Sequence, residues 1–178
     1  QGIAGRYGAR FGAGRVRYTT GERFANEFIA SLQAGTLERF RRRYRSVDLL
    51  CIDDAHFLAG KTATQSEFLH TFDALDLDGA RVVLASDEHP QVIREFNARL
   101  ASRCISGMVV RVEAPDEETR VRLVRRLAER RGLTLDDAGV HAVASACTGG
   151  VREIQGALAR VDALARLLPD LSGEDGAA

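Results

Sequence analysis

The sequence predicts an α/β protein built on a parallel sheet, followed by a small all-helical subdomain. Short apolar runs alternate with longer amphipathic stretches from residue 15 to residue 131, as expected for a parallel α/β domain. From residue 136 onward no run has the character of a strand, and apolar residues recur at helical intervals. We therefore place the α/β core in residues 1–131 and the helical subdomain in residues 132–178.

Composition and charge set broad limits on the function. Of the 178 residues, 45% are hydrophobic, which is enough for a folded core. The 25 basic and 25 acidic residues cancel, so any contact with nucleic acid must come from a local patch. The three cysteines are far apart and predict neither a disulfide framework nor a zinc site. The sequence has no apolar run of about 18 residues and no signal-peptide core, which favours a cytoplasmic protein.

The N-terminal part is predicted to contain a strand between helical segments. The glycine-rich start is interpreted as the end of an element that begins before residue 1. Charged and apolar residues alternate over residues 15–19, as in a short strand. Thr19 and Glu22 have capping-box spacing at the start of a predicted helix over residues 21–34. A strongly basic helix follows Gly35, and its arginines could contact phosphate, face a subunit or form a solvated surface.

The most distinctive stretch is an apolar strand that ends in two adjacent carboxylates. Residues 49–52 are four apolar residues in a row, typical of a strand buried on both faces of a parallel sheet. Such sheets place ligand sites beyond the carboxyl ends of their strands, where Asp53 and Asp54 fall. Successive residues point to opposite faces, so one aspartate can face a metal ion and the other a water. A plain Asp-Asp turn is the alternative.

A helix and a second buried strand follow the two aspartates. Thr64 and Glu67 have capping-box spacing at the start of the helix, whose aromatic face should pack on the sheet. Residues 82–84 are apolar and predict a strand, which is followed by Asp87. A polar residue thus occurs again at a strand end, where ligands bind in parallel sheets.

Two arginines with helical spacing come next. Arg99 and Arg103 are four positions apart, so a helix places them on one face. Two guanidinium groups side by side suit a phosphate or an anion on a neighbouring subunit. Pairing with local carboxylates such as Glu95 is the alternative. Residues 107–112 then read as a further strand, which Pro115 ends.

The C-terminal part is predicted to be helical. A helix from Asp116 to near Gly132 has acidic residues in its first turn and basic residues in its last. A short helix, a glycine pair and an amphipathic helix over residues 151–168 follow. Residues 169–178 have the composition of a frayed end or the start of a linker.

Several ordered blocks of the sequence are distinctive together: LCIDDAHFLAGK at 50–61, TQSEFLHTFDAL at 64–75, SD at 86–87, RLASR at 99–103, APDEETR at 114–120 and VREIQGAL at 151–158. With these blocks, nearly all of residues 1–168 resembles the ATPase domain of the bacterial replication initiators of the DnaA family. The resemblance implies an AAA+ core with a helical lid, ATP and Mg²⁺ as ligands, and weak ATPase activity used as a switch. It also implies duplex opening at the replication origin.

The resemblance assigns a role to each residue of the predicted site. Asp53 matches the Walker B carboxylate that holds Mg²⁺, directly or through water, and Asp54 would help to position the attacking water. Asp87 matches the sensor 1 position near the γ-phosphate. Arg103 matches the arginine finger presented to ATP on the next subunit, with Arg99 as its neighbour.

Other matched positions concern the lid and DNA. Arg152 matches sensor 2, so the helical subdomain would move on the glycine pair as a lid over nucleotide. Contact with single-stranded DNA maps to Ile29 and Lys61. Ala63 stands where many members carry arginine, which removes a phosphate partner. Cys104 replaces a common aromatic residue after the finger.

Partners and missing parts also follow from the resemblance. It implies head-to-tail self-assembly into a filament, origin DNA, the replicative helicase, regulatory proteins and acidic phospholipids. The sequence contains no Gly-x-x-x-x-Gly-Lys-Thr phosphate loop and no helix-turn-helix domain for double-stranded DNA. We therefore expect a chain that begins downstream of the phosphate loop and binds ATP poorly by itself.

Two other functions are open at this point. One is a regulatory AAA+ relative of the initiator that has no duplex-binding domain. The other is a Mg²⁺-dependent, phosphoryl-accepting receiver domain, which also places paired aspartates at strand ends. That function would give no role to Arg103 or Arg152.

Overall fold

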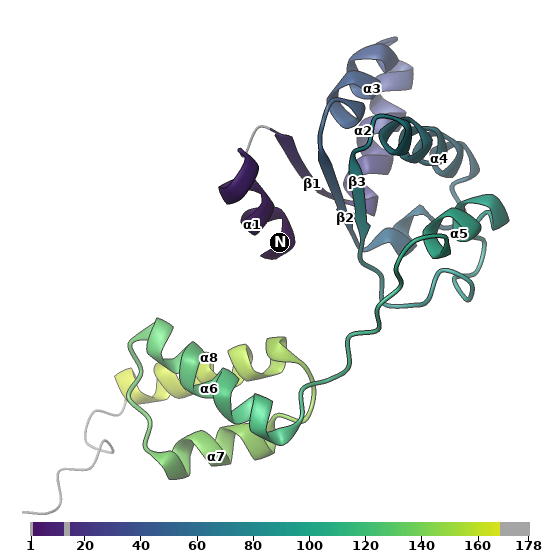
Figure 1. Ribbon diagram of the computed structural model, residues 1–178. Coiled ribbons are helices and arrows are strands. Elements are labelled where there is room, and N and C mark those ends of the chain that lie inside the picture. Colours follow the sequence, from purple (N-terminus) through teal and green to yellow (C-terminus); the bar gives the residue numbers. More distant parts are fainter. Residues whose placement is uncertain (1, 13–14, 168–178) are drawn as a thin grey trace, which may run out of the picture. The chain divides into compact units, whose positions relative to one another are not determined.

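The computed structural model of the chain describes residues 2–12 and 15–167. It divides into two compact units, a first unit of Gln1–Val109 and a second unit of Val110–Ala178 (Figure 1). Within the described ranges, no helix has both the length and the apolar character needed to cross a membrane.

A three-stranded parallel sheet lies at the centre of the first unit. β1 (Val16–Thr20) pairs with β2 (Leu49–Asp53), and β2 pairs with β3 (Arg81–Leu84), so β2 is the central strand (Figure 1). In the register, Thr20 lies beside Asp53 and Leu84 lies beside Ile52. The three strands therefore end at one edge of the sheet, and the predicted parallel α/β fold is confirmed.

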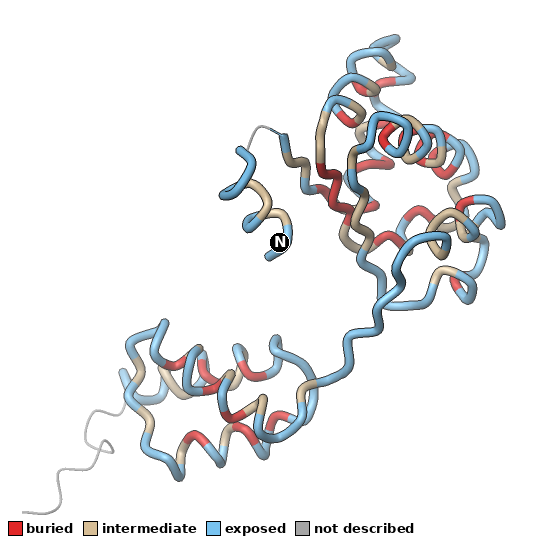
Figure 2. The backbone as a smooth tube through the Cα atoms, in the orientation of Figure 1, coloured by how far each residue is buried: buried red, intermediate tan, exposed pale blue. Residues whose placement is uncertain are grey.

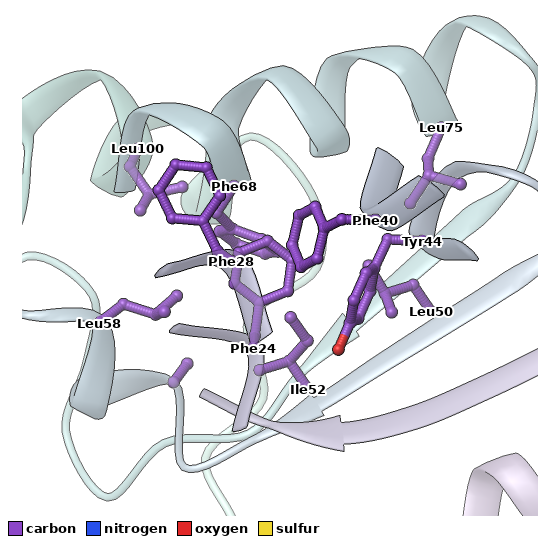
Figure 3. Packing of buried hydrophobic residues seen from close by; sticks show 11 residues of the cluster. Phe24, Phe28, Phe40, Tyr44, Leu50, Ile52, Leu58, Phe68, Leu75 and Leu100 are labelled. Atoms are coloured by element: carbon purple, nitrogen blue, oxygen red, sulfur yellow. The ribbon is translucent and has the colours of Figure 1, made fainter. Parts of the chain in front are cut away.

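All the helical elements of this unit except the first contribute to one aromatic core beside the sheet. The Phe24 ring makes edge-to-face contacts with Phe40, Tyr44 and Phe68, with ring centroids 4.8 to 5.4 Å apart (Figure 3). Such geometry aligns ring edges with ring faces and adds to the stabilisation from burial. The helical elements of this unit are α1 (Gly2–Phe11), α2 (Gly21–Gln33), α3 (Leu37–Arg45), the 3-10 helix η2 (Ala55–Leu58), α4 (Thr62–Leu77) and α5 (Ala98–Ile105).

The second unit packs three helices around a small aliphatic core. They are α6 (Glu117–Arg131), α7 (Asp137–Ala146) and α8 (Val151–Leu167). The buried residues of the three helices form one cluster, and Figure 2 marks buried positions in red on each of these helices. Residues 169–178, read as a frayed end or the start of a linker, lie outside the described residues.

The division between the units comes earlier than the expected boundary at residue 131. α6 belongs to the second unit because its apolar stripe packs on α7 and α8. Val121 and Val124 on this stripe are both in the aliphatic core. The sequence pattern predicted the helix correctly but did not indicate which elements it packs on.

The strand predicted for residues 107–112 is absent from the structure. Among the described residues, no backbone hydrogen bond joins this segment to the sheet. Met108 and Val112 are 89% and 90% exposed. A strand needs a neighbour that pairs with its N–H and C=O groups, and alternation of apolar residues does not supply one.

Two predicted helix caps are also wrong. Thr20 caps α2 by accepting a hydrogen bond from the Arg23 N–H at 3.1 Å, whereas Thr19 is buried. α4 begins at Thr62, so Thr64 lies inside the helix. Glu67 forms ion pairs with two arginines of α3 instead of completing a capping box. A spacing of three residues alone did not identify which hydroxyl meets the helix end.

Candidate functional site

The carboxylate of Asp53 is held in place at the end of the central strand β2. Its Oδ2 accepts a hydrogen bond from the Tyr18 hydroxyl at 2.6 Å, and its Oδ1 accepts one from the backbone N–H of Asp54 at 3.1 Å. Both aspartates are half-buried. The Asp53 carboxylate is therefore oriented by its neighbours while part of the residue remains accessible to solvent.

Tyr18 is a site residue that the sequence reasoning missed. It lies on β1, two positions before Thr20, and Thr20 is the register partner of Asp53. Residues two apart on a strand point to the same face, so Tyr18 can reach along that face to the carboxylate. This alternation on neighbouring parallel strands is the signal that could have identified it.

Asp54 forms a sharp turn after the strand. Its backbone lies in the left-handed region, with φ 52° and ψ 49°. This region costs a non-glycine residue on the order of 1 kcal/mol, although aspartate adopts it more readily than most. The turn brings the Asp54 carbonyl oxygen so close to Gly21 that a Cβ there would lie 2.7 Å away. Glycine at the start of α2 thus permits the close approach of the acidic turn.

Asp87 follows β3 at the same edge of the sheet. The segment after β3 is tied to the segment after β2, because the Ala85 N–H donates to the Ile52 carbonyl and the Ala55 N–H donates to the Ala85 carbonyl, both at 2.9 Å. Asp87 is exposed two residues further along. The structure therefore gathers the three aspartates at the ends of neighbouring strands.

Arg103 pairs with carboxylates of its own chain. Its Nε donates to Asp73 Oδ1 at 2.8 Å, and its guanidinium lies 3.4 Å from Asp76 Oδ2 and over the Phe72 ring. The hydrogen bond and charge of Asp73 raise the pKa of Arg103 above its ordinary value. Local pairing thus occurs, but its partners come from α4 rather than from Glu95.

Arg99 and Arg103 share one face of α5, as their spacing predicted. Asn97 caps this helix by accepting a hydrogen bond from the Arg99 N–H at 2.8 Å. Both arginines line a shallow cavity of about 470 Å³ between α4 and α5, together with Leu69, Asp73, Ala98 and Ser102. Cys104 is half-buried against the aromatic core, and burial raises the pKa of its thiol to about 11.

The remaining predicted residues lie on or beside three different helices. Ile29 is 44% exposed on α2, and Lys61 is the half-buried residue that precedes α4. Arg152 belongs to the second unit and is exposed in the first turn of α8. Beside it, Glu153 accepts a hydrogen bond from the Gly149 N–H at 2.6 Å, which fixes the glycine pair before this helix.

No cluster of three or more His, Cys, Asp or Glu residues forms a potential metal site in residues 2–12 and 15–167. The three cysteine thiols are free, and two of them are buried. Any metal at the acidic edge would therefore use a single carboxylate or a pair, with oxygen atoms from another source.

A parallel sheet with an acidic central strand end, joined to a helical subdomain, defines an AAA+ type of α/β domain. The family model described as the bacterial DnaA ATPase domain matches residues 1–111. The chain belongs to this family. Membership argues against a receiver domain.

Relatives and solved structures agree with this assignment. The chromosomal replication initiator protein DnaA of Levilactobacillus brevis is 44% identical over 86% of this chain. Domain III of the Thermotoga maritima replication initiation protein DnaA is 36% identical, with a TM-score of 0.87 over 93% of this chain and 70% of that one. A replication initiator DnaA bound to AMPPCP and single-stranded DNA is 34% identical, with a TM-score of 0.77 over 88% of this chain and 50% of that one.

The chain spans about a third of the length of the curated relatives that it matches, 34% for the Levilactobacillus brevis protein and 36% for the Thermus thermophilus protein.

Proposed function

We propose that the chain is the nucleotide-responsive core of a bacterial replication initiator, which binds Mg²⁺ and ATP and assembles on origin DNA. The observation that carries this proposal is the Asp53-Asp54 pair at the end of the central strand, in a chain of the DnaA ATPase family. A structural relative bound to AMPPCP and single-stranded DNA supports nucleotide and DNA as ligands. Slow ATP hydrolysis would act as an off-switch.

The donor chemistry at Asp53 fits Mg²⁺. This ion prefers oxygen ligands and commonly uses one or two protein carboxylates together with phosphate oxygens and water. The Tyr18 hydrogen bond leaves other lone pairs of the carboxylate available. Bound there, the ion would neutralise charge on the nucleotide phosphates. Asp54, which follows Asp53 in a left-handed turn, would accept a hydrogen bond from a water.

Arg103 is the residue that we propose to reach ATP on the next subunit. It lies on a helix with Arg99, its side chain is 39% exposed, and a guanidinium can make paired hydrogen bonds to phosphate oxygens. One subunit would thus present arginine where the next presents nucleotide, which is a head-to-tail contact. Contacts of this kind generate filaments when the rotation does not close a ring.

Three further residues have proposed contacts. Asp87 would sense the γ-phosphate from the neighbouring strand end, and Arg152 would bind phosphate from the lid. Ile29 would offer an apolar surface to single-stranded DNA. Lys61, which precedes α4, would neutralise a DNA phosphate, and such contacts weaken with salt.

The test uses a chain extended upstream to include a phosphate loop. Arg103→Ala should leave ATP affinity within about twofold of the unmodified protein, because Arg103 contacts the nucleotide of another subunit, and should abolish ATP-dependent assembly in sedimentation velocity. Asp53→Asn should instead weaken Mg²⁺-dependent ATP binding. Arg122→Ala, on an exposed part of α6, is the matched control and should assemble normally. Unchanged assembly of Arg103→Ala with ATP would contradict the finger assignment.

A further inference from the structure

A buried glutamine joins three segments of the first unit. Gln65, near the start of α4, is 2% exposed. Its Nε2 donates to the carbonyl oxygens of Leu58 at 3.0 Å and Glu95 at 2.8 Å, and its Oε1 accepts from the Asn97 N–H at 2.5 Å. All three partners are backbone groups. Both amide hydrogens and the amide oxygen are therefore used.

The partners of Gln65 lead to the two halves of the proposed site. Leu58 is the last residue of η2, the 3-10 helix that follows Asp54. Asn97 is the N-cap of α5, the helix that carries Arg99 and Arg103. One side chain thus connects the acidic turn with the arginine helix, which are separated by more than 40 residues in the sequence.

The backbone near Glu95 needs such support. Glu95 has a φ of 58°, in the left-handed region that glutamate rarely adopts, and such residues persist only where their surroundings hold them. The Gly60 N–H donates to the Glu95 carbonyl at 3.3 Å, and a Cβ on Gly60 would lie 2.8 Å from the Glu95 carboxylate. The loop after η2 and the loop before α5 therefore touch at this point, and the Gln65 side chain bonds to the last residue of η2 and to the loop before α5.

We propose that Gln65 is a positioning residue that fixes α5, and with it Arg103, relative to the acidic turn of the same subunit. The role rests on the proposed function, in which Arg103 reaches the nucleotide of the next subunit. A primary amide suits this role because it can donate two hydrogen bonds and accept one at the same time. An apolar side chain of similar size would leave the Asn97 N–H without this partner. The Glu95 and Leu58 carbonyl oxygens would keep only their 3.3 Å bonds from the backbone N–H groups of Gly60 and Lys61.

The structural half of the proposal is tested by hydrogen exchange in the 178-residue chain. Gln65→Leu keeps the volume and removes the three bonds, so exchange of the amides of residues 97–105 should accelerate by about tenfold or more. The matched control is Thr71→Val on the same helix. Thr71 is fully buried, and its hydroxyl has no hydrogen-bond partner among the described residues, so exchange in α5 should not change. Unchanged exchange in Gln65→Leu overturns the proposal.

The functional half uses the chain extended with the upstream phosphate loop. Gln65→Leu should retain ATP affinity within about twofold and lose ATP-dependent assembly. The double variant of Gln65→Leu with Arg103→Ala should assemble no worse than either single variant. Where Gln65→Leu does not fold, as judged by circular dichroism, Gln65→Met replaces it. Normal assembly of the Gln65 variant, with loss in Arg103→Ala, overturns the inference and leaves the proposed function standing. Normal assembly of Arg103→Ala overturns both.

Discussion

The two compact units hold their helices together with different chemistry. The core of the first unit is rich in aromatic rings, and all buried polar residues of the described chain lie in this unit. The core of the second unit consists of aliphatic side chains and Cys147. Both units exclude water from a core, but among the described residues only the first unit has fully buried polar side chains.

The difference between the two cores corresponds to the side chains that each unit has to hold in place. Apolar contacts are not directional, so a core of valine and leucine brings helices together without fixing a single polar atom. Buried hydrogen bonds demand specific partners, and an unmet partner is costly. In the first unit such bonds join α4 to η2 and to the start of α5, the helix that carries Arg103. The second unit presents Arg152 on an exposed helix turn.

The largest expected effect tests whether the two units unfold independently. Leu158 is fully buried in the aliphatic core, so Leu158→Ala should cost the second unit about 3 kcal/mol, a large part of the stability of a small helical unit. All three tyrosines lie in the first unit and the chain has no tryptophan. Tyrosine fluorescence should therefore show an unchanged unfolding midpoint, while circular dichroism shows an earlier helix loss. A shift of both signals together would contradict independence.

A somewhat smaller effect is expected for the buried ion pair that joins α3 to α4. Glu67 is 5% exposed at its side chain and bonds to Arg41 at 2.9 Å and Arg45 at 2.8 Å. Glu67→Gln removes the buried anion that the two guanidinium groups share and leaves Arg41 only its exposed partner Glu38. It should lower the free energy of unfolding of the first unit by about 2 kcal/mol. Urea unfolding followed by tyrosine fluorescence measures it.

The control for this change is Glu38→Gln. Glu38 also bonds to Arg41, at 3.1 Å, but its side chain is 79% exposed. Solvent screens such a pair, so its loss should cost at most about 0.5 kcal/mol. An equal loss of unfolding free energy in the two variants would show that burial of the Glu67 ion pairs does not increase their contribution to stability.

The same pair predicts a pH dependence for the first unit. Burial alone would raise the pKa of Glu67, but the hydrogen bonds and charges of Arg41 and Arg45 outweigh it and lower the pKa below its ordinary 4.5. The folded state thus binds a proton less readily than the unfolded state. The stabilisation is present above about pH 4.5 and is lost as pH falls through the folded pKa. Glu67→Gln should flatten the fall in the tyrosine-detected midpoint over this range.

The local elements of the first unit were predictable because their signals lie within a few residues. The helix predicted over residues 21–34 is α2, and the four apolar residues before Asp53 form the buried part of β2. The spacing of Arg99 and Arg103 placed them on one helix face, as the structure has them. Periodicity reports which face of an element is buried, and it does so from neighbouring residues alone.

The contacts that support the candidate site were not predictable in this way. Tyr18 and Asp53 are 35 positions apart, and Gln65 and Asn97 are 32 apart. Each contact depends on how two elements pack, which no local pattern encodes. The missing strand at residues 107–112 has the same cause, since pairing requires a neighbour that the segment itself cannot provide.

A modest effect is expected at the acidic strand end. Tyr18→Phe keeps the ring but removes the hydroxyl that orients the Asp53 carboxylate. The free energy of Mg²⁺-dependent ATP binding should weaken by about 1 kcal/mol, which is about fivefold in affinity. Isothermal titration of the extended chain with Mg²⁺ and ATP measures it. Tyr7→Phe, whose ring packs on Phe11, is the control and should not change affinity. Equal affinities for the Tyr18 variant and the unmodified chain would show that Asp53 needs no such support.

The smallest effect on stability is expected for the carboxylates that pair with Arg103. The Asp73 and Asp76 side chains are 47% and 60% exposed, so solvent screens both pairs, and replacing them with asparagine should leave the unfolding midpoint of the first unit nearly unchanged. In the assembly that we propose, however, these anions would compete with the nucleotide phosphate for the Arg103 guanidinium.

The double variant Asp73→Asn, Asp76→Asn should therefore assemble with ATP at a several-fold lower protein concentration, and the gain should shrink as salt screens the pairs in the unmodified chain. Sedimentation velocity at two ionic strengths measures both effects. Glu118→Gln, which removes an exposed carboxylate beside Arg122, is the control for the change in net charge. Weaker assembly of the double variant would mean that the two aspartates hold Arg103 in the geometry that assembly requires. The first unit would then hold this arginine in place, as it holds the acidic turn.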